Sequence, residues 1–82
     1  MKIRTFNTAL SAKQVFNLTN EARKAIEWAT NQITTPLSIE GEFEGISWKV
    51  IPESKQAIFF DPNNNSPFIA VDFEEEEANE EF

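Results

Sequence analysis

The spacing of apolar residues changes at Pro36, and this change most constrains what the chain can fold into. Before Pro36, apolar residues recur at steps of three and four, namely Val15, Leu18, Ala22, Ala25, Ile26, Ala29 and Ile33. This spacing predicts one amphipathic helix over residues 12–32. After Pro36, apolar and polar residues alternate, which is typical of strands with one buried face. Because proline disfavours helical backbone in the residue before it, Thr34-Thr35-Pro36 is expected to end the helix.

The start of this helix is predicted just after Ser11. Ser11 and Gln14 have the spacing of a capping box, in which each side chain accepts a hydrogen bond from the other residue's backbone N–H. Leu10 and Val15 have the spacing of a hydrophobic staple across the same turn. Thr19-Asn20 is a weak point, because both side chains compete for backbone hydrogen bonds.

Residues 37–50 predict a β-hairpin with a two-residue turn at Glu44-Gly45. On one face the turn sets the pairs Phe43 with Ile46, Gly41 with Trp48, and Ile39 with Val50. On the other face it sets the pairs Glu42 with Ser47 and Glu40 with Lys49. Both faces are chemically coherent, and Trp48 would lie over the gap that Gly41 leaves.

Three further strands complete the prediction. The opening residues alternate, with Ile3 on one face and Lys2, Arg4 and Phe6 on the other. Strands are also predicted over residues 56–60 and 68–71, separated by a loop rich in Asn and Pro. We therefore expect an α+β fold in β-α-β-β-β-β order, with one helix packed on a four- to five-stranded antiparallel sheet. The sheet face away from the helix is left to solvent or to a partner.

The net charge of −7 divides unevenly along the chain. Residues 1–71 contain seven basic and seven acidic side chains, which cancel, whereas residues 72–82 hold the other seven acids and no base. Such a run of like charges with little apolar content does not favour order of its own. We therefore expect a small α+β domain over residues 1–71 and a flexible acidic tail over residues 72–82.

Composition also argues against several functions. The chain has no Cys and no His, so it lacks cysteine nucleophiles, thiolate zinc sites and the commonest general base and metal ligand, and we expect no enzyme, no cofactor and no metal. No apolar run approaches the roughly 20 residues that span a bilayer, and residues 1–6 lack the apolar stretch of a signal peptide. We expect a cytoplasmic protein without a membrane partner, in the host cytoplasm if it is phage-encoded. A core of this size is marginal, so a homodimer formed through the helix or a sheet edge is a reasonable expectation.

The tail carries an aromatic residue at its very end, Phe82, behind a run of acids. It resembles the C-terminal tail of bacterial single-stranded DNA-binding proteins and of the analogous proteins of T7-like phages. The resemblance implies that the Phe82 ring enters an apolar pocket on a replication or repair protein, that its carboxylate meets a basic residue, and that the upstream acids contact a basic rim. The implied partner-binding residues are Asp72, Phe73, Glu74, Glu75, Glu76, Glu77, Glu80, Glu81 and Phe82. The resemblance covers residues 72–82 and does not extend to the body.

A protein that binds single strands also needs aromatic rings that stack on bases, and Lys or Arg side chains that follow the phosphates. The candidates are Lys2, Arg4, Phe6, Trp48, Lys49, Lys55, Phe59 and Phe60. A small core needs several of the aromatic residues for itself. Phe59 and Phe60 are adjacent in a predicted strand, so their rings point to opposite faces and one of them is a candidate for exposure.

These observations predict a single-stranded DNA-binding protein that stacks bases on sheet aromatics and recruits a replication or repair partner through its tail. One alternative is a protein-binding inhibitor or DNA mimic that occupies a basic nucleic-acid-binding site. Another is an interaction module whose tail only improves solubility. The uneven charge also suggests that the tail competes with DNA for the cations of the body, so that removing residues 72–82 would tighten binding at low salt.

Overall fold

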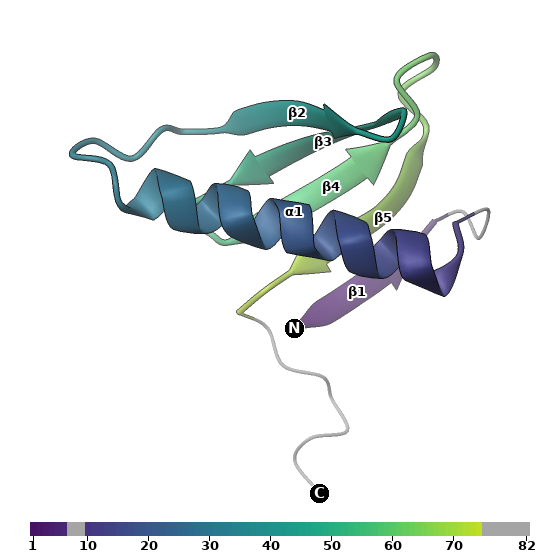
Figure 1. The fold of residues 1–82 in the computed structure, drawn as a ribbon, viewed down its shortest axis with the longest axis horizontal. Helices are drawn as coiled ribbons and strands as arrows, with labels where there is room; N and C mark the ends of the chain where they lie inside the picture. The colour runs from purple at the N-terminus through teal and green to yellow at the C-terminus, as the bar shows by residue number, and fades with distance from the viewer. Residues whose placement is uncertain (7–9, 75–82) are drawn as a thin grey trace, which may run out of the picture.

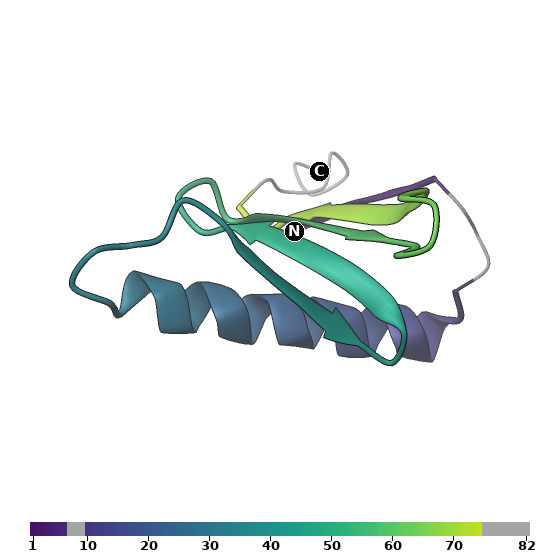
Figure 2. The same ribbon diagram turned by 90° about the horizontal axis from the view of Figure 1, so that it is seen from above.

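The computed structural model describes residues 1–6 and 10–74 of the chain (Figure 1). In chain order its elements are β1 (Lys2–Thr5), α1 (Ala12–Thr30), β2 (Ile39–Phe43), β3 (Ile46–Ile51), β4 (Gln56–Phe60) and β5 (Pro67–Asp72). The five strands form one antiparallel sheet in the order β1-β5-β4-β3-β2. Figure 2 shows α1 lying along one side of this sheet. The predicted α+β class is therefore confirmed, with five strands in the sheet.

The helix α1 begins where the capping box predicts. The Gln14 backbone N–H donates to Ser11 Oγ at 3.2 Å, and the Ser11 N–H donates to Gln14 Oε1 at 2.8 Å. These two bonds satisfy donors that have no partner within the first turn of a helix. Leu10 and Val15, the predicted staple, are both half-buried against the core.

The other end of α1 comes two residues earlier than predicted, at Thr30, with Asn31 as its C-cap. Thr30 Oγ1 donates to the carbonyl of Glu27, and Gln32 Nε2 donates to the carbonyl of Trp28. Side chains thereby satisfy carbonyls that a longer helix would have bonded to backbone N–H groups. The prediction that Ile33 continues the buried stripe is wrong, since Ile33 is fully exposed.

The hairpin of β2 and β3 has the predicted register at all five pairs. Glu44 and Gly45 have φ angles of 53° and 82°, the left-handed backbone that a two-residue turn of this kind requires at both positions. Trp48 lies over Gly41, since a Cβ built on Gly41 would fall 2.7 Å from Trp48 Cε2. The gap left by glycine is thus filled by the indole ring.

The core lies between α1 and the sheet. It is formed by side chains that share the helix-facing side of the strands and the inner stripe of α1, namely Leu18, Ala22, Ile26, Ile46, Val50, Ala57, Phe59, Ile69 and Val71. Because successive residues of a strand point to opposite faces, the residues between these positions form a second side. We call this second side, which points away from α1, the outer face.

The start of the predicted tail is part of the folded domain. β5 includes Asp72, whose Cα partners are Lys2 and Gln56. The Phe73 N–H donates to the carbonyl of Lys55 at 2.9 Å, and the Arg23 guanidinium lies 5.4 Å from the centre of the Phe73 ring. Residues 75–82, which hold the rest of the predicted tail, lie outside the described residues.

Candidate nucleic-acid interface

One row of side chains crosses the outer face from edge to edge. The registers of the four strand pairs align Arg4 on β1, Ala70 on β5, Ile58 on β4, Lys49 on β3 and Glu40 on β2. Residues directly opposite one another in a sheet project to the same side. The row therefore has a small apolar centre with a cation on each side of it and a carboxylate at one edge.

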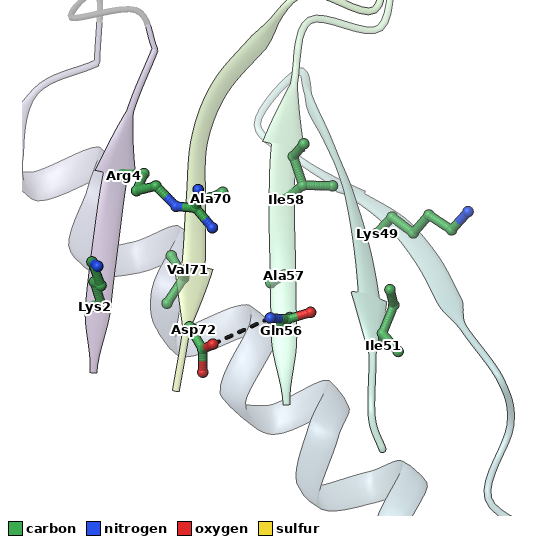
Figure 3. Close-up of a pocket in the computed structure, with 10 residues that line it drawn as sticks. All are labelled: Lys2, Arg4, Lys49, Ile51, Gln56, Ala57, Ile58, Ala70, Val71 and Asp72. Atoms are coloured by element: carbon green, nitrogen blue, oxygen red, sulfur yellow. Dashed lines mark hydrogen bonds between the residues drawn. The ribbon is translucent and has the colours of Figure 1, made fainter. Parts of the chain in front are cut away.

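A hollow of about 240 Å³ lies on this face, between the row and the end of the sheet where β1 and β4 begin (Figure 3). Ile51, Ile58 and Ala70 give it an apolar floor, while Lys2, Arg4 and Lys49 supply cations around it. Figure 3 shows the Arg4 side chain reaching from β1 towards Ala70, whereas Lys49 points away from the centre towards β2. The hollow thus offers apolar contact and positive charge on one surface.

The two ends of the hollow differ in chemistry. At one end Gln56 Nε2 donates to Asp72 Oδ2 at 3.2 Å, which adds a carboxylate beside Lys2. On the opposite side of the hollow, β1 and β4 end, and Phe6 and Phe60 lie at these ends. Phe6 is 57% exposed and Phe60 is half-buried. The lining as a whole carries three cations and one carboxylate.

The structure brings together several of the predicted nucleic-acid-binding residues on the outer face. Lys2, Arg4 and Lys49 line the hollow, and Phe60 lies on the same face because its partner in the register is Ser47. Lys55 lies elsewhere, in the turn between β3 and β4, where its ammonium forms an ion pair of 3.1 Å with Glu74. Of the predicted cations on the strands and their turns, three therefore share one surface and Lys55 does not.

Two of the predicted residues, Trp48 and Phe59, face α1 instead of the outer face. Phe59 is completely buried in the core, and Trp48 packs against that core over Gly41. The physical reason is the register, because Phe59 is paired with Trp48 and with Ile69, and directly paired residues project to the same side of the sheet, here the side that α1 covers. The Phe59 ring is therefore not available to stack on a base, and the half-buried Trp48 ring does not belong to the outer face, so this part of the predicted site is corrected.

The apolar floor is the part of the candidate site that the sequence prediction missed. Ile51 and Ile58 are 41% and 36% exposed. Both isoleucines lie at strand positions where the alternation predicts a polar, outward-facing residue. Ile51 shares a side of β3 with Ser47 and Lys49, and Ile58 lies between the core residues Ala57 and Phe59 of β4. An apolar residue at an outward-facing position of a strand indicates that both faces of the strand make apolar contacts.

No protein-family model, curated protein or solved structure matches this chain. Within the described ranges, no helix combines the length and the apolarity needed to cross a membrane. The same ranges contain no group of three or more acidic side chains placed to hold a metal ion. The geometry of the outer face is therefore the main basis for a functional argument.

Proposed function

We propose that the outer face binds single-stranded DNA. The observation that carries this proposal is the hollow itself, in which Arg4 and Lys49 stand on either side of an apolar floor that includes Ile58. Proteins that bind single strands combine positive charge for the backbone with flat apolar or aromatic surfaces for the bases. No element in residues 1–6 and 10–74 covers this side of the sheet (Figure 2).

The separation of Arg4 and Lys49 along the row suits this role. Arg4 lies on β1 and Lys49 on β3, so three strand spacings separate them along the row. At about 4.8 Å for each spacing, the two strand positions are about 14 Å apart. A base lying flat on Ile58 and Ala70 would fit between two such backbone contacts.

Two aromatic rings extend this surface. β1 and β4 run in the same direction, because each is antiparallel to β5, so Phe6 and Phe60 stand at the same end of the sheet. Stacking of a base on an aromatic side chain contributes roughly 1–3 kcal/mol. In the proposal Phe6 and Phe60 take the stacking role on the outer face, because Trp48 and Phe59 lie on the side that α1 covers.

The acidic tail supplies the second half of the proposal, recruitment of a replication or repair protein. This half is supported by the resemblance of residues 72–82 to the tails of single-stranded DNA-binding proteins, with Phe82 as the anchor. Deleting Phe82 alone is expected to abolish capture of a purified single-stranded-DNA-processing partner while leaving DNA binding unchanged. Capture that persists without Phe82 would show that the tail does not act as an anchor.

The DNA-binding half is tested by fluorescence anisotropy of a labelled oligothymidine titrated with the full chain. Tryptophan emission is a poor reporter here, because Trp48 faces α1 and Trp28 lies on the helix. Arg4→Ala and Lys49→Ala are each expected to weaken binding and to reduce the dependence of log K on log salt by about 0.7 for each phosphate that the variant no longer neutralises. Ile58→Glu, which places a carboxylate on the apolar floor, is expected to abolish binding.

The matched controls are Lys13→Ala and Lys24→Ala, which remove the same charge from exposed positions on α1. If these variants weaken binding as much as Arg4→Ala does, the outer face is not the binding surface. A chain that does not bind the oligonucleotide even at about 0.01 M salt, where charges are little screened, would contradict the proposal. A DNA mimic would give that result and would bind a basic protein instead.

A further inference from the structure

The two edge strands carry opposite charges on the outer face. β1 presents Lys2 and Arg4, whereas β2 presents Glu40 and Glu42. All four side chains are exposed. Each edge strand pairs with one neighbour among the described strands, β1 with β5 and β2 with β3. The backbone N–H and C=O groups on the far side of each edge strand therefore form no part of the sheet ladder.

Edge strands of this kind can pair with another chain, and strand direction limits the ways in which copies of this chain can do so. Every neighbouring pair in the sheet is antiparallel, so β1, β4 and β2 all point the same way. Consider a second copy whose outer face lies on the same side as that of the first. This second copy can place its β1 beside β2 of the first copy only in a parallel arrangement. It can place its own β2 beside β2 of the first copy only in an antiparallel arrangement.

Charge distinguishes between these arrangements. Pairing β2 with β2 would bring Glu40 and Glu42 against the same carboxylates of the other copy, and pairing β1 with β1 would do the same with cations. Like charges directly opposite one another destabilise a sheet. Pairing β1 with β2 instead brings opposite charges together. Both symmetric arrangements are therefore disfavoured and the unsymmetric one is favoured.

A single parallel register satisfies both pairs of charges. It places Lys2 beside Glu40 and Arg4 beside Glu42. The same register places Ile3 beside Gly41 on the helix-facing side. There the Trp48 ring already fills the space above Gly41, and it offers an apolar contact to the incoming isoleucine.

We propose that copies of this chain associate head to tail, with β1 of one copy paired in parallel with β2 of the next. Such an interface joins two different surfaces, so two copies do not close it, and rows or rings result. Each interface is small, because β1 has four residues and β2 has five. The association is therefore weak and dependent on salt. It does not rest on DNA binding, although it would align successive outer faces along one strand of DNA.

Sedimentation velocity of the full chain over a range of protein concentrations tests the proposal. At about 0.01 M ionic strength the weight-average sedimentation coefficient is expected to rise with concentration, and at about 0.15 M it is expected to rise less. Two single substitutions separate the edges. Arg4→Glu changes β1 beside Ala70, and Glu42→Lys changes β2 beside Ser47, so neither places like charges together within the sheet.

Each variant alone is expected to associate about tenfold more weakly than the unmodified chain, because one attraction in the interface becomes a repulsion. Mixing the two variants in equal amounts restores association, since the new carboxylate on β1 meets the new ammonium on β2. The double variant R4E/E42K, in which both charges are exchanged within one chain, is expected to associate as the unmodified chain does. The matched controls Lys13→Glu and Glu27→Lys change the net charge equally at exposed positions of α1 and are expected to leave association unchanged.

Three results would overturn the proposal. One is a chain that stays monomeric at every concentration at low ionic strength. Another is an Arg4→Glu variant that loses association while Glu42→Lys keeps it, because β2 would then not be the partner of β1. The third is a mixture of the two variants that associates no better than either alone. Circular dichroism of each variant confirms that it is folded, and R4E/E42K tests the pairing even if one single variant is unstable.

Discussion

The indole ring of Trp48 occupies the space in which a side chain at Gly41 would begin. A Cβ built on Gly41 would fall closest to Trp48 Cζ2 and 2.7 Å from Cε2, which is too close for carbon atoms that are not bonded to one another. Gly41 has an ordinary strand backbone, so its role is to leave space and not to adopt an unusual conformation. The position of the ring thus depends on the absence of one side chain on the neighbouring strand.

Gly41→Ala is therefore expected to lower the free energy of unfolding by about 1–3 kcal/mol, the usual cost of overpacking. In most strand positions the same change would stabilise the protein, because alanine restricts the unfolded chain more than glycine does. Urea unfolding measures the difference. In the background of Trp48→Leu, most of the cost should disappear, since the clashing ring is gone. A Gly41→Ala variant as stable as the unmodified chain would contradict the packing described above.

The candidate site was only partly predictable at the level of single residues. Strand alternation correctly placed Lys2 and Arg4 together, opposite Ile3. It also showed that Phe59 and Phe60 point to opposite sides, but it did not say which ring the helix would cover. That choice depends on how the strands pair, because Phe59 lies opposite Trp48 and Ile69 on the helix-facing side, and pairing between strands is not visible in a local pattern.

Among the elements, α1 has a capping box at its first turn. Ser11→Ala removes the acceptor for the Gln14 N–H and is expected to cost about 0.5–2 kcal/mol of stability. Ser11→Asp retains an acceptor at the same place and should cost little. Thermal and urea unfolding of the two variants provide the comparison. Equal losses from both variants would show that the cap contributes nothing specific.

The end of α1 was harder to predict than its start. A capping box is a local pattern of two residues, and the structure contains both of its hydrogen bonds. The C-terminal end instead depends on competition, in which Thr30 and Gln32 side chains bond to helical carbonyls and leave Ile33 outside. Apolar spacing alone carries no information about that competition. By contrast, the hairpin of β2 and β3 was fully predictable, because the turn at Glu44-Gly45 fixes every pair behind it.

The end of β5 provides a second test at this scale. A chain cut after Val71 lacks the pairing of Asp72, the interactions of Phe73 with Lys55 and Arg23, and the ion pair of Glu74. We expect it to be less stable by about 1–3 kcal/mol than a chain cut after Glu74, which keeps all of these. Urea unfolding of the two shortened chains measures the difference. Equal stability would place the edge of the folded domain at Val71.

At the scale of the whole molecule, the chain joins a run of acids beyond Glu74 to a domain that carries the candidate binding face. Residues 75–82 contain five glutamates, so removing them takes the net charge from −7 to −2. If these acids compete with DNA for Arg4 and Lys49, the shortened chain binds oligothymidine more tightly, and most of the gain is lost at about 0.15 M salt. Anisotropy titrations of the two chains at low and physiological salt test this. Equal affinity at low salt would count against competition.

The place of β5 in the sheet has a consequence for how the molecule is made. β5 follows β2, β3 and β4 in the chain, yet it lies between β1 and β4, so Ile3 finds its partner in Val71. β2 to β5 can assemble as consecutive hairpins from neighbouring segments, whereas β1 pairs with a segment that lies more than 60 residues further along the chain. During synthesis β1 therefore leaves the ribosome before β2 to β5 and is secured only after β5. Its two cations have no place in the sheet until β5 has been synthesised.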